Sequence, residues 1–236
     1  AAVLQREVCR QLLDMLRASN ARHMPADILD AGCGTGYGAR LLASEWPSAR
    51  LAAADFAAAM AQKTASTTAA ACVADIESLP FRNQAFDLWW SSLTVQWCDP
   101  RYVFAEAVRV LRPQGRLALS TLGPGTYAEL RQAFAGIDHH RHTLDFSEPA
   151  PLAAAAETAG LAQLQIVRRT ITLHYPDLNT LLGAVKAIGA NALGDGRRSG
   201  MMGKAAWQAL SAAYEAQRTA DGLPASYDVI LLTARA

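Results

Sequence analysis

The stretch that decides the fold is Leu29-Asp30-Ala31-Gly32-Cys33-Gly34-Thr35-Gly36-Tyr37-Gly38. Its first residues belong to a short apolar run that ends at Ala31. Its last residues begin a helical pattern over residues 36–46, which Pro47 ends. Glycines in such a turn let the backbone bend sharply and let a ligand approach without a Cβ in the way. A turn of this kind at the carboxyl edge of a parallel sheet is typical of nucleotide binding.

Strand and helix patterns alternate outward from this turn. The sequence predicts a helix over residues 1–16 and further helices at residues 57–63, 102–111, 126–134 and 149–159. It predicts strands at residues 27–31, 50–54, 70–74, 86–91, 115–121, 164–173 and 227–234. This alternation predicts an α/β fold with a mostly parallel seven-stranded sheet and helices on both faces.

A long insertion separates the last two predicted strands. Residues 175–225 look helical, and an insertion of this length between neighbouring strands is more often functional than idle. We therefore expect a single domain over residues 1–236, with residues 175–225 as a helical lid within it.

Composition excludes several classes of protein. The chain has 236 residues, of which 51% are hydrophobic and 18% charged, so wholesale disorder is unexpected. A formal net charge of +1 gives no general attraction to nucleic acid or to an anionic membrane. The cysteines form no Cys-x-x-Cys pair, which favours reduced thiols and a cytoplasmic protein. The N-terminal segment reads as an amphipathic helix and not as a secretory signal, and, without an initial Met, the natural N-terminus is expected to be missing.

Two nucleotide cofactors compete for the glycine-rich turn. Residues 34–39 also satisfy the dinucleotide pattern G-x-G-x-x-G/A, which alone is a weak signal. The carboxylate of Asp30 decides against it, since an acid at this turn would repel a pyrophosphate. The ammonium and sulfonium groups of S-adenosylmethionine both favour a nearby carboxylate. Asp55, after the second strand, can accept from ribose hydroxyls, although an NAD enzyme would show the same acid.

The run Asp-Ala-Gly-Cys-Gly-Thr-Gly resembles motif I of the class I methyltransferases, which implies their Rossmann-like fold. The spacing D-x-x-x-LPF-x-x-x-x-FD from Asp75 resembles the family segment in which the acid reaches the adenine amino group and its neighbour, here Ile76, flanks the ring. Ser91 is expected to end its strand facing the cofactor. The resemblance and the order of these motifs imply cofactor binding by Asp30, Gly32, Cys33, Gly34, Gly36, Asp55, Phe56, Asp75, Ile76, Ser91 and Trp97.

Three further segments narrow the resemblance. Residues 95–99 (VQWCD), residues 120–126 (STLGPGT) and residues 185–191 (VKAIGAN), the last followed by Gly196 and Arg197, resemble the malonyl-acyl carrier protein O-methyltransferases of biotin synthesis. The resemblance implies methyl transfer from S-adenosylmethionine, leaving S-adenosylhomocysteine, to the free carboxylate of a malonyl thioester on acyl carrier protein or coenzyme A.

One position departs from the family. Where the family commonly has an arginine, in His-Val-Asn-Arg-Phe, this chain has Asp145, so another cation is expected to hold the substrate carboxylate. The candidates are Arg141, Lys186 and Arg197, with the hydroxyls of Ser120 and Thr121 sharing the contact. Arg197, Arg198, Lys204 and Lys186 are expected to form a basic mouth for the acidic carrier.

The expected chemistry needs no base and no metal. A carboxylate is already ionised at neutral pH, so it can attack the sulfonium methyl directly. The enzyme is expected to accelerate this transfer by positioning the carboxylate against the methyl group. The cluster of His139, His140 and His142 contains Arg141 and has no companion acid or cysteine at ligand spacing, so no metal site is expected. Three alternatives stay open: methylation of another small carboxylic acid such as an aconitate-like one, a non-catalytic S-adenosylmethionine-binding assembly factor, and an NAD oxidoreductase.

Overall fold

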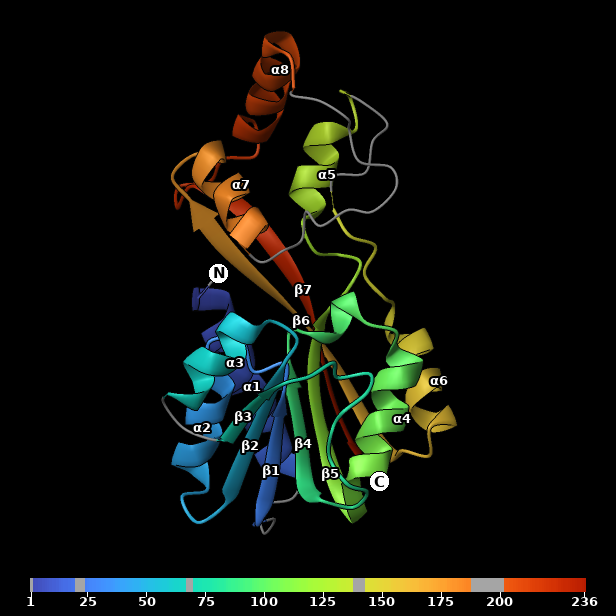
Figure 1. Ribbon diagram of the computed structural model, residues 1–236. Coiled ribbons are helices and arrows are strands. Elements are labelled where there is room, and N and C mark those ends of the chain that lie inside the picture. Colours follow the sequence, from blue (N-terminus) through green and yellow to red (C-terminus); the bar gives the residue numbers. More distant parts are fainter. Residues whose placement is uncertain (1, 20–23, 67–69, 138–142, 188–201) are drawn as a thin grey trace. The chain divides into compact units, whose positions relative to one another are not determined.

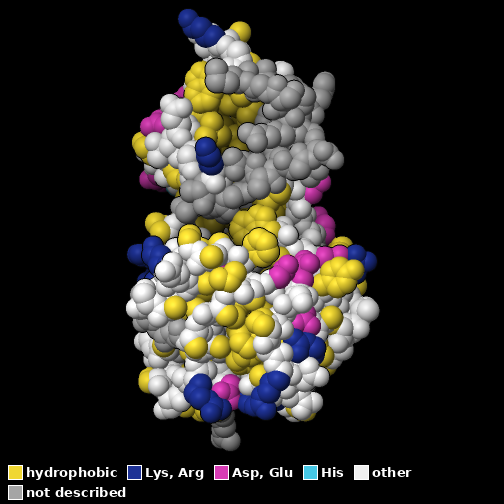
Figure 2. All heavy atoms as spheres, viewed as in Figure 1, with side chains coloured by type: hydrophobic (Ala, Val, Ile, Leu, Met, Phe, Trp, Pro, Cys, Tyr) yellow, Lys and Arg dark blue, Asp and Glu magenta, His cyan; other side chains and the backbone are white. Residues whose placement is uncertain are grey.

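The computed structural model describes residues 2–19, 24–66, 70–137, 143–187 and 202–236. Figure 1 shows its helices and strands along the chain, and Figure 2 shows the described side chains by type in the same view. Their order is α1 (Ala2–Ser19), β1 (Asp27–Ala31), α2 (Tyr37–Glu45), β2 (Arg50–Asp55), α3 (Ala58–Ala65), β3 (Ala70–Val73), β4 (Phe86–Ser92), η1 (Val95–Trp97), α4 (Pro100–Val110), β5 (Leu111–Leu122), α5 (Ala128–Phe134), α6 (Pro149–Thr158), β6 (Ala162–Tyr175), α7 (Leu178–Ala187), α8 (Lys204–Glu215) and β7 (Leu223–Arg235).

The strands form one seven-stranded sheet in the order β3-β2-β1-β4-β5-β7-β6. β1 pairs in parallel with β2 and β4, β2 pairs in parallel with β3, and β4 pairs in parallel with β5. The strand order reverses next to β1, which is where ligands bind in open α/β sheets. The predicted α/β fold with a mostly parallel sheet is confirmed.

β1 lies in the interior of the sheet. All five of its residues are buried, as expected for a central strand with helices over both faces. In Figure 1, α1, α2 and α3 lie on one side of β1 to β5, and α4 and α6 lie on the other. One core cluster joins side chains of α4 and α6 to the sheet, among them Phe104, Leu152 and the fully buried Trp89.

Strand ends differ from the prediction at β5. The sequence Arg112-Pro113-Gln114-Gly115 predicts a break before residues 115–121, but β5 already begins at Leu111, which lies opposite Phe86. The register shifts between Phe86 and Leu88, so the extra residues form an irregularity within the strand. α4 ends accordingly at Val110, one residue before the predicted end.

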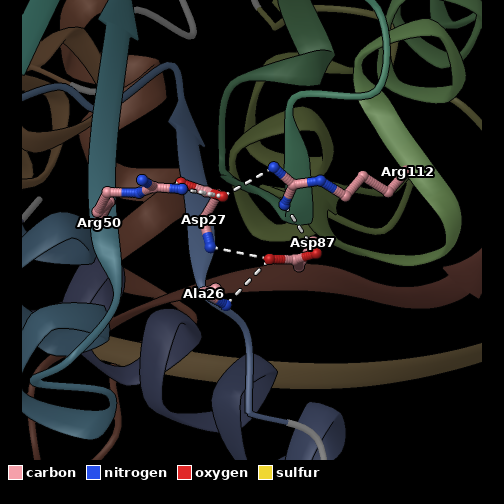
Figure 3. Close-up of polar contacts among 5 residues, drawn as sticks. All are labelled: Ala26, Asp27, Arg50, Asp87 and Arg112. Atoms are coloured by element: carbon pink, nitrogen blue, oxygen red, sulfur yellow. Dashed lines mark hydrogen bonds and ion pairs between the residues drawn. The ribbon is translucent and has the colours of Figure 1, made fainter.

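The start of β1 is held by a network of ion pairs, which Figure 3 shows. Arg50 from β2 donates two parallel bonds to Asp27, from Nε to Oδ1 at 2.6 Å and from Nη2 to Oδ2 at 2.7 Å. Arg112 from β5 bridges Asp27 Oδ2 and Asp87 Oδ1, both at 2.8 Å. Asp87 Oδ2 in turn accepts from the backbone N–H groups of Ala26 and Asp27. The network joins four neighbouring strands at the amino edge of the sheet.

The described chain divides into two compact units. Unit 1 comprises residues 1–4, 122–146 and 169–229, and unit 2 comprises residues 5–121, 147–168 and 230–236. The predicted lid, residues 175–225, falls in unit 1 and contributes α7 and α8. The expectation that the whole chain acts as a single domain stays a prediction. No helix among the described residues is long and apolar enough to cross a membrane.

Candidate functional site

The glycine-rich turn lies in unit 2, between the carboxyl end of β1 and the start of α2. Gly32, Gly34 and Gly36 have φ angles of 78°, 53° and 78°, in the left-handed region that favours glycine. Cys33 between them is 6% exposed, and burial raises the pKa of its thiol to about 12. A thiol that stays protonated suits a small packing residue and not a nucleophile.

Two threonines hold this turn in place. Thr94, after β4, donates from Oγ1 to the Gly32 carbonyl at 3.2 Å, and a Cβ on Gly32 would come within 2.3 Å of that hydroxyl. Thr64, in α3, donates to the Gly34 carbonyl at 3.2 Å, and a Cβ on Gly36 would come within 2.8 Å of its Oγ1. Sequence reasoning missed both residues, because neither belongs to a motif and only the strand order brings them to the turn.

Four N–H groups of the turn have acceptors within the protein. Gly32 and Cys33 both donate to the Ala54 carbonyl, at 2.8 and 3.0 Å, and Gly34 donates to Asp55 Oδ2 at 2.8 Å. Gly36 donates to the Cys33 carbonyl at 2.9 Å. A pyrophosphate-binding turn presents its N–H groups to the phosphates. The arrangement therefore disfavours a dinucleotide, in agreement with the argument from the acid at Asp30.

Asp30 is buried beneath the turn, with 2% of its surface exposed. Its Oδ2 atom has no hydrogen-bond partner among the described residues. Burial raises the pKa of Asp30 to about 7; a hydrogen bond from the Ala39 backbone opposes this shift, and the charge of Asp55 adds to it. Ionising a buried carboxyl without a cation costs free energy, so the site favours binding of a positive group beside it.

Trp90 is the direct neighbour of Asp30 across the sheet. The two residues are register partners in β1 and β4, and Trp90 is fully buried. A Cβ on Gly38 would lie 3.0 Å from Asp30 Oδ2 and 3.1 Å from Trp90 Nε1. The indole N–H has no acceptor among the described residues. Gly38 thus leaves room where a buried carboxylate and a buried indole approach each other.

Asp55 ends β2 and braces the turn. Its Oδ2 accepts from Gly34 and its Oδ1 accepts from the N–H of Ala57 at 2.9 Å, and each oxygen keeps a further lone pair. The next residue, Phe56, is 78% exposed. The structure therefore places a half-buried carboxylate and an exposed aromatic ring next to each other. The predicted contacts of Asp55 and Phe56 with a cofactor stay predictions.

The segment after β3 presents the third acid. Asp75 is exposed and accepts from the Glu77 N–H at 2.9 Å, whereas Ile76 is 4% exposed and packs in the core. Trp97, in η1 after β4, is 48% exposed. The predicted contacts of Asp75, Ile76 and Trp97 with a cofactor stay predictions.

The prediction that Ser91 ends its strand is wrong. β4 continues to Ser92, and Ser91 is fully buried, with a hydroxyl that has no partner among the described residues. Consecutive strand residues face opposite sides, so Ser91 and Ser92 face different sides of the sheet. The predicted contact of Ser91 with a cofactor stays a prediction. Ser92 Oγ accepts from Cys9 Sγ at 3.3 Å and from Ser120 Oγ at 2.9 Å.

The two hydroxyls expected to touch a substrate are buried and already bonded. Ser120, besides donating to Ser92, accepts from the Leu93 N–H at 3.1 Å. Thr121 donates to Gln96 Oε1 at 3.3 Å, and only 3% of it is exposed. A contact with a substrate carboxylate stays a prediction that would require these bonds to be exchanged.

The cations expected to hold the substrate are only partly described. Lys186, at the end of α7, is exposed and forms no ion pair with a described residue. Arg141 and Arg197, as well as Arg198 of the expected basic mouth, lie outside the described residues. Asp145, at the position of the family's arginine, is exposed. Among the residues that the structure describes, no three His, Cys, Asp or Glu side chains are grouped so as to hold a metal ion.

Solved structures share this fold. The YcgJ protein of Bacillus subtilis superposes with a TM-score of 0.65 at 17% identity, over 96% of this chain and 98% of the other. Phosphoethanolamine N-methyltransferase 2 of Haemonchus contortus superposes with a TM-score of 0.56 at 16% identity, over 96% of this chain and 52% of the other. At such identities the likeness shows the fold alone.

Sequence comparisons show the family. A methyltransferase domain model matches residues 29–119, from β1 to β5. The malonyl-acyl-carrier protein O-methyltransferase of Dechloromonas aromatica is 48% identical over 100% of this chain and 88% of its own length. That of Herminiimonas arsenicoxydans is 40% identical over 99% and 88%. The biotin biosynthesis bifunctional protein BioHC of Cellvibrio japonicus is 39% identical over 98% of this chain and 46% of its own length. The chain belongs to the family of malonyl-acyl-carrier protein O-methyltransferases.

Proposed function

We propose that this protein transfers the methyl group of S-adenosylmethionine to the free carboxylate of malonyl-acyl carrier protein, which makes the methyl ester primer for biotin synthesis. The observation that carries the proposal is the carboxylate of Asp30, buried at the end of β1 with one oxygen unpartnered among the described residues. Such a group fits a cationic cofactor and disfavours a pyrophosphate. The family relation supplies the acceptor.

The residues of unit 2 fit the three parts of the cofactor. Asp30 would attract the ammonium of the methionine part, and Asp55 would accept from the ribose hydroxyls with the lone pairs that the backbone leaves unused. Asp75 would accept from the adenine amino group, while the exposed rings of Phe56 and Trp97 would cover apolar parts of the ligand. When bound, S-adenosylmethionine supplies an electrophilic methyl carbon on a sulfonium.

Positioning is the chain's own contribution to the reaction. A malonyl carboxylate is ionised at neutral pH and needs no general base. Its oxygen must line up with the methyl carbon and the sulfur, and such orientation contributes on the order of 7–11 kcal/mol to lowering the barrier. A cation would hold the carboxylate, and Lys186, Arg141 and Arg197 are the candidates. Lys204 and Arg198 would join Lys186 and Arg197 in contacting an acidic carrier.

A methyl-transfer assay tests the proposal. Malonyl-acyl carrier protein, malonyl-coenzyme A and free di- and tricarboxylates are offered as acceptors, with S-adenosylhomocysteine release as the readout. We expect the malonyl thioesters to be methylated, with the carrier-bound form preferred. Methylation of free acids alone would contradict the proposal, and so would failure to rescue a biotin-requiring strain with the gene.

Substitution of the candidate cations separates substrate binding from cofactor binding. We expect Arg197→Ala to slow methylation about tenfold or more, by the loss of a charged bond to the carboxylate, while S-adenosylhomocysteine affinity is kept. Lys186→Ala and Arg141→Ala are compared in parallel, and Arg10→Ala, an exposed change on α1, is the control. Equal loss of methylation and cofactor affinity in an intact fold would contradict a substrate role.

Asp145 favours a second candidate function. With an acid where the family commonly has an arginine, the cation that would hold a malonyl carboxylate is absent at this position, so either another cation holds it or the acceptor is another small carboxylic acid. The same assay distinguishes the two, because such an enzyme would prefer a free di- or tricarboxylate. A protein that binds S-adenosylhomocysteine but methylates none of these acids would instead be a non-catalytic binding protein.

A further inference from the structure

The loop between β3 and β4 is fixed along α4 by one ion pair. This loop carries Asp75 and Ile76, the residues proposed to meet the adenine. On α4, Glu106 and Arg109 lie one turn apart and pair through two bonds, from Nε to Oε1 and from Nη2 to Oε2, both at 2.7 Å. The two side chains are 17% and 30% exposed, so the pair is largely withdrawn from water.

Every N–H of the Arg109 guanidinium has an acceptor. Beyond Glu106, its Nη2 donates to the Leu79 carbonyl at 2.9 Å, and its Nη1 donates to the Phe81 carbonyl at 2.6 Å and to Asn83 Oδ1 at 3.0 Å. Glu106 Oε2 also accepts from the Leu79 N–H at 2.7 Å. The pair therefore satisfies both backbone groups of Leu79 and fixes the path of the loop over several residues.

The two ends of the loop are also attached to α4. Glu77, two residues after Asp75, accepts from the N–H of Asp99 at 2.5 Å, at the residue that caps the start of α4. At the other end, the N–H of Gln84 donates to the Arg109 carbonyl at 2.9 Å. The exposed Asp75 thus projects from a loop whose backbone is held at both ends and in the middle.

A loop that is fixed before the cofactor arrives affects the affinity for the cofactor. A loop that must be ordered by its ligand reduces affinity by the entropy lost on ordering, and a loop that is held in advance does not. In the loop, Glu106 and Arg109 contact mainly backbone groups. They therefore set the position of the loop and do not themselves contact Asp75. We propose that Glu106 and Arg109 are positioning residues that hold Asp75 ready to accept from the adenine amino group; this rests on the function proposed above.

The experiment measures discrimination between bases. Calorimetry compares S-adenosylhomocysteine with S-inosylhomocysteine, in which a carbonyl replaces the adenine amino group, on the full chain and on Arg109→Lys and Glu106→Gln. Lysine keeps the charge but cannot make the fork of five bonds. Arg218→Lys is the matched control, because Arg218 also pairs with a glutamate one turn away, Glu215, and donates to the Pro176 carbonyl at 3.0 Å, but in unit 1.

We expect the unsubstituted protein to prefer the adenosyl compound. Arg109→Lys and Glu106→Gln should each lower the affinity for the adenosyl compound about tenfold and the affinity for the inosyl compound little. Each variant should therefore lose most of the discrimination between the two compounds. The KM for S-adenosylmethionine should rise while kcat at saturation is kept. Arg218→Lys should behave like the unsubstituted protein.

The outcomes separate this inference from the proposed function. If the unsubstituted protein binds neither compound, or binds both equally, the proposed adenine contact is wrong. If it discriminates and the loop variants discriminate as well as it does, only the positioning role is wrong. Equal loss for both compounds, or a lowered thermal midpoint with unchanged discrimination, would show a purely structural pair and would also overturn the inference.

Discussion

Asp27 and Asp30 lie on the same strand, β1, and their surroundings are opposite. Asp27 opens the strand and its carboxylate accepts two hydrogen bonds from Arg50 and one from Arg112, and the hydrogen bonds from Arg50 lower the pKa of its carboxyl. Asp30, next to the other end, has no cation partner among the described residues, and burial raises its pKa to about 7. One carboxylate is satisfied by the fold, and the other is left for a ligand.

The two edges of the sheet differ in their effect on the stability of the fold. At the amino edge, charges are paired and join four strands, whereas at the carboxyl edge a buried acid raises the free energy of the folded chain when it ionises. Perturbed acids of this second kind are typical of functional sites. Substitutions at the carboxyl end of β1 should therefore change cofactor affinity, and substitutions at its amino end should change stability.

The largest effect is expected from Asp30→Asn. The change keeps the shape and removes the charge, so affinity for S-adenosylhomocysteine should fall about 100-fold, as expected for the loss of a charged hydrogen bond of up to about 3 kcal/mol. Calorimetry at pH 8 gives the result, and Asp14→Asn, at an exposed acid of α1, is the control. Unchanged affinity in Asp30→Asn would refute the assignment of Asp30.

At the other end, Asp27→Asn should act on stability alone. We expect the free energy of unfolding to fall by about 1–3 kcal/mol, because bonds from two arginines to a carboxylate become bonds to a neutral amide. Urea denaturation at pH 7 measures this loss. Cofactor affinity should stay within about twofold, since the turn lies at the opposite edge of the sheet. A large loss of affinity without a loss of stability would reverse the roles of the two ends.

The two acids should also give opposite limbs to the pH dependence of stability. The pKa of Asp30 is raised from 3.8 to about 7. Its contribution to the stability of the folded chain is therefore fully present below the pKa of the unfolded chain and is lost as the pH rises through about 7. The pKa of Asp27 is lowered, so its contribution is present above the unfolded value and is lost as the pH falls. The slope for one acid is at most about 1.4 kcal/mol per pH unit.

Urea denaturation of both variants from pH 4 to pH 8 measures these limbs. Asp30→Asn should flatten the decline above pH 4, and Asp27→Asn should flatten the acid limb. Saturating S-adenosylhomocysteine should have the same effect as Asp30→Asn on the unsubstituted protein, because a bound ammonium keeps Asp30 ionised. A decline above pH 4 that persists unchanged in Asp30→Asn would assign it to another group.

The smallest effect is expected from Thr94→Val at the carboxyl end. Valine fills the same space beside Gly32 but cannot donate to its carbonyl, so cofactor affinity should fall about threefold, equivalent to a net hydrogen bond of about 0.7 kcal/mol. Thr94→Ser retains the hydroxyl and should retain the affinity. If valine binds as well as threonine while serine binds poorly, the methyl group and not the hydroxyl supports the turn.

The sequence predicts the fold more completely than the site. The buried run that ends at Ala31, the glycines after it and the alternation of strands and helices are local signals, and they predict the parallel sheet. The end of β4 at Ser92 is not a local signal, because Ser91 and Ser92 are equivalent until their burial is known. The start of β5 at Leu111 likewise depends on its pairing with Phe86 across the sheet.

Residues that support the turn escaped prediction for a related reason. Thr64 and Thr94 reach the glycines from α3 and from the segment after β4, and no spacing in the sequence relates them to residues 32–36. The same holds for the contacts of Arg109 with the loop, whose residues lie 26 to 30 positions earlier in the chain. Motifs identify the acids that face a ligand, whereas the groups that hold those acids emerge only once the strand order is known.

The pairing of Trp90 with Asp30 gives the protein an optical readout of its own. Indole emission responds to a charge placed beside the ring, so ionisation of Asp30 should shift the fluorescence of this buried tryptophan. The experiment uses a variant that keeps Trp90 and has phenylalanine at its other tryptophan positions. Its fluorescence would report both the titration of Asp30 and the binding of a cation beside it.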